Sequence, residues 1–408
     1  TADKSDSSDS GDDSSAEGKV TLNVTTTFAG TESNVDKYQE TIENWQKETG
    51  NKVNDSSASA DEAMKARVIT DFETGAEPDV MFYFNGNDSN PFVEADKVVP
   101  IDEIREKYPD YAANMNDDLI PGSPVDGVKY AVPFYGYWEG MYVNKKVCED
   151  AGVEIPGPDT TWEQFMETCQ KIKDAGYTPI TCDDAYILCL FGYHMSRLNG
   201  YDKTSDIVKN NKWDDPSVME TAKAYADFAQ KGYFSENIAS NVFPAGQNQE
   251  LALGTAAMYL NGSWLPNEVK NMAGDDFQWG CFSYPAVEGG TDGTEAANYG
   301  GQVLAINKNS QHAEDAFKLI TYITKGEFDK KLSEESLGIP SDTTNSEWPV
   351  QLTDVKPVME SLKTRYPWAA GAEDNVDMTP IIKENMTKLC SGAITADEFV
   401  SNLQAAGK

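Results

Sequence analysis

Histidine is nearly absent from this chain, and the short motifs that mark most metal and cofactor sites are missing. The two histidines, His194 and His312, lie far apart in the sequence. Neither an H-E-x-x-H pair nor a C-x-x-C pair occurs, so we expect no zinc site or other metal site. The motifs G-x-x-x-x-G-K-[ST], G-x-G-x-x-G and G-x-S-x-G are also missing, which disfavours NTPases, dinucleotide enzymes and serine hydrolases and predicts no cofactor. A glycosidase is not excluded, because it needs only two carboxylates.

Positive charge is scarce as well. The chain has 33 Lys and Arg against 68 Asp and Glu, a formal net charge of -35. Such a surface repels phosphate backbones and anionic lipids, so we expect neither a nucleic-acid partner nor direct membrane binding. A polyanionic ligand would need a local basic site. No run of apolar residues approaches the roughly 18 that a membrane span requires.

The six cysteines are too few for a disulfide framework in 408 residues. Cys169 and Cys189 lie in apolar stretches and are typical of small core residues, whereas a bridge between Cys182 and Cys189 stays an alternative. We expect free thiols, which in an exported protein would suit an anaerobic habitat.

The first 18 residues, TADKSDSSDSGDDSSAEG, contain six acidic residues, one Lys and no large apolar side chain. A segment of this composition buries too little surface to fold, so we expect a disordered tether. It has neither an initial Met nor a signal peptide, which fits a cloning boundary or a mature exported protein whose signal has been removed. Tethers of this type commonly follow a lipidated cysteine in Gram-positive surface proteins. We therefore expect a cell-surface lipoprotein, with a periplasmic protein as the alternative.

Strand and helix patterns alternate after the tether. Residues 20–27 alternate apolar and polar side chains like a strand, and residues 35–50 have apolar side chains at helical spacing up to Gly50. A short strand at 52–54, a helix at 63–75 and the nearly continuous apolar run 79–84 follow. This β-α-β-α-β order predicts an α/β fold, and 39% hydrophobic residues over this length suffice for two or three domains.

Helix signals dominate the middle and the C-terminal part. Thr161 with Gln164, and Thr395 with Glu398, have the spacing of capping boxes. Asp215-Pro216 predicts the start of another helix, and Gly232 predicts its end. We expect Ser310 to cap a helix that follows a short strand at 304–306.

Four segments, in order, resemble the extracellular solute-binding proteins of carbohydrate-uptake ABC transporters, family 1, a group that includes maltose-binding protein. Residues 65–84, KARVITDFETGAEPDVMFYF, match the family's helix, break and P-D-V strand. Residues 130–172 resemble its crossing strand with Asn-Lys, followed by A-G, P and T-W. Residues 253–264, LGTAAMYLNGSW, match G-x-A-A-M-x-x-x-G-x-W, and residues 300–323 resemble the glycine turn, strand and helix that follow.

The resemblance implies a two-lobed fold of the periplasmic-binding-protein type with a ligand cleft between the lobes. Lobe one would comprise 19–133 plus 300–343, and lobe two 134–299 plus 344–408. The family further implies an extracellular bacterial protein, monomeric and without enzymatic activity. Such a protein closes its cleft on an oligosaccharide and delivers it to the permease subunits of an ABC transporter.

Aromatic rings can stack on sugar faces, and amides or carboxylates can bind sugar hydroxyls. Trp264, after a predicted strand at 256–260 and an exit turn at 261–263, is the strongest candidate for a stacking platform. The other candidates lie where the family has its ligand loops: Phe28, Glu32, Tyr83, Asn85, Asn87, Tyr135, Tyr137, Trp138, Glu139, Asp184, Tyr186, Tyr299, Gly300 and Trp368.

Structural roles compete with several of these assignments. Trp264 could be a core residue, Asp184 a helix N-cap and Tyr299-Gly300 a strained hinge. His194 lies in an apolar segment and is expected to be a satisfied buried histidine.

We expect a binding protein for a neutral oligosaccharide, and xylo-, malto-, manno- and galacto-oligosaccharides all suit flat aromatics with amides. Three alternatives stay open. They are a secreted glycosidase or lyase, a surface carbohydrate-binding module without a transporter, and a binding protein for iron or a polyamine, which the charge of -35 allows.

Overall fold

The computed structural model describes residues 20–30, 34–59, 62–83 and 85–408, which form two compact units. Unit 1 contains the described residues up to Tyr135, together with Gln302–Glu335 and Ser341–Asn345. Unit 2 contains Gly136–Gly301, Ser336–Pro340 and the chain from Ser346 onward. Each unit combines strands with helices, so the predicted α/β class is confirmed. The expected tether lies outside the described residues.

Unit 1 is built on a sheet with the strand order β2-β1-β3-β9. β1 (Thr21–Thr25) pairs in parallel with β2 (Lys52–Asp55) and β3 (Val80–Tyr83), and β3 pairs antiparallel with β9 (Tyr299–Ile306). In this register Val24 lies opposite Val80, which in turn lies opposite Ile306. Val24 and Val80 are completely buried, as the alternation along β1 and the apolar run in β3 predicted.

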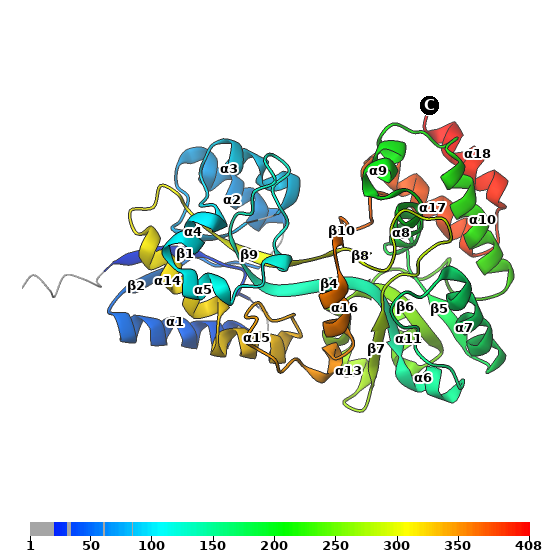
Figure 1. The fold of residues 1–408 in the computed structure, drawn as a ribbon, viewed down its shortest axis with the longest axis horizontal. Helices are drawn as coiled ribbons and strands as arrows, with labels where there is room; N and C mark the ends of the chain where they lie inside the picture. Colours follow the sequence, from blue (N-terminus) through cyan, green and yellow to red (C-terminus); the bar gives the residue numbers. More distant parts are fainter. Residues whose placement is uncertain (1–19, 31–33, 60–61, 84) are drawn as a thin grey trace, which may run out of the picture. The chain divides into compact units, whose positions relative to one another are not determined.

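Helices cover this sheet, and α1 (Val35–Thr49) packs against α14 (Ala313–Thr324) (Figure 1). The predicted helical spacing is confirmed, because Tyr38, Ile42 and Trp45 are the buried residues of α1. The prediction for Ser310 is wrong. Its hydroxyl donates to Asp79 and accepts from the N–H of His312, and the helix begins only at Ala313. The other helices of this part are α2 (Glu62–Thr74), α3 (Asn90–Glu94), α4 (Ile101–Lys107), α5 (Pro109–Ala113) and α15 (Glu327–Ser336), with short 3-10 helices η2 (Gly86–Ser89) and η3 (Asp117–Leu119).

Unit 2 contains most of β4 (Val132–Asn144), which pairs antiparallel with β6 (Ala256–Gly262) and β7 (Trp279–Phe282). β5 (Thr178–Thr181) pairs in parallel with β6. The predicted exit turn at 261–263 is wrong for its first two residues, because Asn261 and Gly262 continue the ladder opposite Gly140 and Glu139. β8 (Ala296–Ala297) and β10 (Thr364–Arg365) form a separate parallel pair.

Four helices of unit 2 pack against one another: α8 (Ile187–Asn199), α10 (Pro216–Gln230), α17 (Thr379–Cys390) and α18 (Ala396–Ala406) (Figure 1). Both predicted capping boxes are confirmed, at the starts of α7 (Trp162–Asp174) and α18. Pro216 begins α10 as predicted, and the predicted end at Gly232 is confirmed, because Gly232 follows the C-cap Lys231 at a positive φ of 75°. The remaining helices are α6 (Lys145–Asp150), α9 (Tyr201–Lys209), α11 (Gly246–Leu253), α12 (Leu265–Glu268), α13 (Lys270–Ala273), η4 (Val350–Leu352) and α16 (Val355–Ser361).

All six cysteines are buried free thiols, so the bridge between Cys182 and Cys189 does not form. The prediction for His194 is confirmed, because its Nδ1 lies 2.9 Å from the hydroxyl of Tyr284 inside unit 2. Burial is the main cause that lowers the pKa of His194 to about 3, so its ring stays neutral at physiological pH.

A buried carboxylate in unit 1 holds the short segment 341–345. Asp329 in α15 accepts hydrogen bonds from the backbone N–H of Ser341 at 2.9 Å and of Asp342 at 3.1 Å. Burial raises its pKa from an ordinary 3.8 to about 6, and the charge of Asp342 adds to this, although both hydrogen bonds act in the opposite direction. The charged form of Asp329 is therefore disfavoured in the folded state.

This pKa predicts a pH-dependent contribution to stability. Because the folded state binds the Asp329 proton more tightly than the unfolded chain, the group makes the free energy of unfolding fall as the pH rises from about 4 to about 6. We expect Asp329→Asn to remove this slope in urea unfolding at a series of pH values. Asp397→Asn, at an exposed position, is the control that should keep the slope. An identical slope in wild type and Asp329→Asn would contradict the prediction.

Candidate ligand-binding site

Pairing of β4 with β6 brings three predicted site residues together in unit 2. Glu139 lies directly opposite Gly262, and the ring of Tyr137 lies 6.2 Å from the indole of Trp264, at an angle of 60°. Tyr137 and Trp264 are both half-buried. Two aromatic rings in edge contact, each with an exposed part, give a surface on which a flat apolar ligand face can pack.

Gly262 sets the position of the indole of Trp264. A Cβ atom built on Gly262 would lie 2.2–2.3 Å from three carbons of the indole ring, so any other residue would displace the ring. The ring therefore lies flat across the end of β6. The glycine of the motif G-x-W is therefore required for steric reasons, which the sequence alone does not reveal.

Tyr299, Gly300 and Arg365 extend this group. The guanidinium of Arg365 lies 4.0 Å from the centre of the Tyr299 ring, and its Nη1 donates to the Tyr299 carbonyl. A Cβ on Gly300 would lie 2.9 Å from the hydroxyl of Tyr137 and 3.4 Å from Arg365 Nη1. We call Tyr137, Trp264, Tyr299, Gly300 and Arg365 the ring cluster.

Arg365 is the member of the ring cluster that sequence reasoning missed. The chain has only four arginines, and this one stands in the segment T-R-Y-P-W, directly before the predicted Trp368. An arginine next to aromatic residues predicted to bind the ligand, in a chain with so few arginines, could have indicated a site residue. The positive charge of Arg365 acts to lower the pKa of Tyr137. Desolvation by burial is the larger effect, so this pKa is raised.

Glu139 lies beneath the ring cluster, completely buried. One carboxylate oxygen accepts a long hydrogen bond of 3.4 Å from Asn298, and the side chains of Tyr193 and Cys189 also lie within hydrogen-bonding reach of the carboxylate. Burial raises the pKa of Glu139 well above its ordinary value. Glu139 offers no surface to a solute here, so its contact with a ligand stays a prediction.

Trp138 lies on the opposite face of β4 and is completely buried, with its ring against Gly140 and 5.8 Å from Tyr142. Tyr186 is buried as well, between Tyr259 and the half-exposed Trp368, with ring centres 5.8 and 5.7 Å away. Neither Trp138 nor Tyr186 offers surface to a solute here, and their contact with a ligand stays a prediction.

Asp184 is exposed, and its carboxylate accepts the N–H of Phe243 at 2.9 Å. Its neighbour Asp183, which is buried, accepts the N–H groups of Ala185 and Tyr186 ahead of α8. These bonds of Asp183 lie in the turn before α8, whose N-cap residue is Tyr186, so the capping role considered for Asp184 is wrong.

The predicted residues of unit 1 do not form a comparable group. Phe28 is buried in the core, with its ring 5.0 Å from Tyr38. Asn85 precedes η2, and Asn87 is exposed within it. Tyr135 is half-buried at a positive φ of 49°. Tyr83 ends β3, and Glu32 lies outside the described residues.

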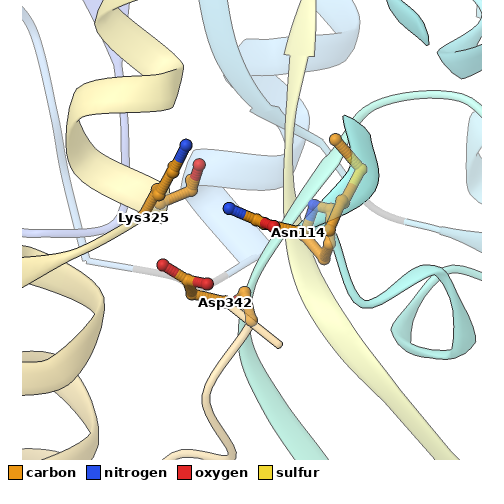
Figure 2. A pocket seen from close by; sticks show the side chains of 7 residues that line it. Asn114, Lys325 and Asp342 are labelled. Carbon is orange, nitrogen blue, oxygen red and sulfur yellow. The ribbon is translucent and has the colours of Figure 1, made fainter. Parts of the chain in front are cut away.

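A small pocket in unit 1 is too small for a sugar. Asn114, Lys325 and Asp342 converge on it from three segments, as Figure 2 shows, and the buried Ser341 also lines it. Its volume of about 10 Å³ suits one water molecule.

Residues 29–327 match the family model described as bacterial extracellular solute-binding protein. The chain belongs to this family. That finding confirms the resemblance seen in the sequence, and the proteins of this family are binding proteins rather than enzymes.

Curated relatives of this solute-binding protein share about a quarter of their residues with it. A binding protein of Brucella abortus is 23% identical over 61% of this chain, and the chain spans 59% of that protein's length. The multiple sugar-binding protein of Streptococcus mutans is 26% identical over 48% of this chain and 47% of its own length. The sn-glycerol-3-phosphate-binding periplasmic protein of Rhizobium meliloti is 23% identical over 41% of both.

The fold has solved counterparts. RafE from Streptococcus pneumoniae superimposes with a TM-score of 0.74 at 19% identity, and the match covers 95% of this chain and 97% of RafE. A second RafE structure is a complex with raffinose. At this identity the likeness establishes the two-lobed α/β fold. Among the described residues, no helix is long and apolar enough to cross a membrane.

The described residues contain no group of three or more His, Cys, Asp or Glu side chains placed to hold a metal ion. We therefore expect EDTA to leave ligand affinity unchanged in titration calorimetry. EDTA would lower the affinity if loop carboxylates held a calcium ion, because calcium takes oxygen ligands and needs no His. Restoration of affinity by added Ca²⁺ after EDTA treatment would reveal it.

Proposed function

We propose that this protein binds a neutral oligosaccharide outside the cell and delivers it to the permease of an ABC transporter. The observation that carries the proposal is the pair of half-buried rings, Tyr137 and Trp264, held in place by Gly262. Sugar rings offer flat C–H faces that can pack on such aromatics.

The family and the named relatives support this proposal. One relative is called a multiple sugar-binding protein, and the fold counterpart RafE has been solved with raffinose. We propose that the ligand favours a closed state of the protein and that this state docks on the permease. We also propose that residues of unit 1, such as Asn85 and Asn87, contact the ligand.

A panel of neutral oligosaccharides in a thermal-shift assay tests the ligand class. A ligand that binds only the folded state raises its melting temperature by mass action, so one group of related oligosaccharides should stabilise the protein. Incubation of the same sugars without appearance of new reducing ends would separate binding from a glycosidase. A panel without any shift, together with a clear shift by spermidine or ferric ion, would reject the sugar proposal.

A phosphorylated polyol is the second candidate. Arg365 brings a guanidinium into the ring cluster, and one relative is named for sn-glycerol 3-phosphate. The same assay should therefore include sn-glycerol 3-phosphate. Stabilisation by this compound and by no sugar would favour the second candidate.

We also infer a monomeric, lipid-anchored protein of a Gram-positive cell surface. The acidic, small-residue composition of residues 1–18 supports a tether. Deletion of residues 1–18 should leave the affinity for the ligand unchanged, and the full precursor should fractionate with the membrane. A large loss of affinity on deletion would show that the segment takes part in binding.

A further inference from the structure

Unit 2 contains a cavity of about 760 Å³ that shares no residue with the ring cluster. Its lining comes from the loop before α7, from β7 and from α16, which packs against β7 (Figure 1). Pockets of about 300–1,000 Å³ with mostly apolar linings are the usual sites of small-molecule binding. The oligosaccharide proposal leaves this cavity without a role.

Apolar side chains form much of the lining: Ile155, Pro156, Phe282, Pro357 and Val358. Gly280, next to the lining residue Cys281, makes room for one wall, because a Cβ there would lie 2.4 Å from Cδ1 of Ile155. The absence of a side chain at Gly280 therefore lets Ile155 pack directly on β7 at this wall.

Two hydroxyl groups and one ammonium group near the cavity are engaged within unit 2. The hydroxyl of Ser283 donates to the Thr294 carbonyl at 2.8 Å, and that of Ser361 donates to the Val358 carbonyl at 2.7 Å. Lys145 Nζ lies 3.3 Å from the lining carboxylate of Asp354. The lining also contains the carboxylates of Asp159 and Glu295, against one basic residue, Lys363. One oxygen of Glu295 accepts the N–H of Gly293 at 3.1 Å, which leaves the other oxygen for a ligand. Carboxylates outnumber the basic residue of the lining, so the cavity favours a ligand that brings donors and positive charge.

We propose that this cavity binds a small organic ammonium compound, with its apolar body against Phe282 and Val358 and its N–H groups toward Asp159 and Glu295. Opposite charge and hydrogen bonding both favour a cation over a neutral molecule of the same shape. An anion of that shape would meet the same carboxylates and be repelled.

Cys281 provides a reporter inside the cavity. It lines the cavity and is 6% exposed, whereas the other five cysteines are 0–3% exposed. Burial and the carboxylate of Asp354 raise the pKa of its thiol, so modification by methyl methanethiosulfonate is followed at about pH 9. We expect Cys281 to react faster than the completely buried Cys169, Cys182 and Cys189, as measured by mass spectrometry. Equal rates at all six thiols would show that the cavity is closed in solution and would overturn the proposal.

Three probes with one apolar body test the ligand class: 4-phenylbutylamine, 4-phenylbutanol and 4-phenylbutyrate. The amine should protect Cys281 at a concentration at least tenfold lower than the alcohol, and the acid should not protect it. In the double variant Asp159→Asn, Glu295→Gln, the amine should protect Cys281 only at the concentrations that the alcohol requires. Ser361→Trp, at an exposed rim position, should abolish protection by both.

Equal protection by the three probes, or protection that survives Ser361→Trp, would overturn the proposal. Both sets of variants lie outside the ring cluster, so they should leave oligosaccharide affinity unchanged. A failure of the ammonium site is thereby distinguishable from a failure of the proposed function.

Discussion

Replacement of Trp264 with Ala should weaken oligosaccharide binding at least tenfold and leave the melting temperature almost unchanged. Stacking and burial of a sugar face on an indole contribute on the order of 1–3 kcal/mol, or roughly 5- to 150-fold in affinity. Trp264 is half-buried, so its removal opens no large cavity in the core. Calorimetric titration with the sugar found in the thermal-shift panel, together with a melting curve, measures both quantities.

Two further variants sharpen this experiment. Gly262→Ala keeps the indole but forces it out of place, because the new methyl group would overlap the ring, so it should also weaken binding. Trp348→Ala is the matched control, since this half-buried tryptophan of the same unit lies against Lys356, outside the ring cluster. A Trp264→Ala protein that melts much earlier but binds normally in the cold would show that Trp264 is a core residue, whose loss costs about 3–5 kcal/mol.

Replacement of Arg197 with Ala should lower the free energy of unfolding by about 3–5 kcal/mol. Arg197 in α8 is completely buried and donates to the carbonyls of Tyr284 and Pro285 and to the hydroxyl of Tyr366. Its guanidinium also lies 5.5–5.7 Å from the ring centres of three tyrosines. Removal of the side chain would leave several buried acceptors without donors and open a cavity among the rings.

Urea unfolding measures this loss, and Arg67→Ala is the control. Arg67 in α2 makes a solvent-exposed bond to the Ser56 carbonyl at 2.6 Å, so its removal should cost no more than about 1 kcal/mol. The folded fraction of Arg197→Ala should still bind the sugar. A cost below 1 kcal/mol for Arg197 would mean that its donors are replaced by water.

Local elements were predictable because their signals lie within one turn of helix or one strand. The capping boxes at Thr161 and Thr395 decide two helix starts through side chains only three residues apart. The prediction for Ser310 failed for a reason that is not local. Its hydroxyl has a partner in Asp79, from a distant strand, that the sequence pattern does not reveal.

The ring cluster was only partly predictable, because it depends on pairings between distant segments. Alternation along β4 predicts that Tyr137 and Trp138 face opposite sides, but not which side is covered by helices. Arg365 joins the cluster because β10 pairs with β8, whose residues lie nearly 70 positions earlier in the chain, and nothing local to T-R-Y-P-W states that pairing. Spatial neighbours of this kind follow from the register of the strands.

The discontinuous composition of unit 1 determines when it can fold during synthesis. Val80 of β3 must pair with Ile306 of β9, and α14, which packs against α1, follows β9. A ribosome that has released only the first 135 residues has therefore released a sheet that lacks its fourth strand. Its apolar edge must wait while all of Gly136–Gly301 is made. Such a nascent chain exposes the unpaired edge of β3 until β9 arrives, so its folding is slowed by the long separation of the two strands in the sequence.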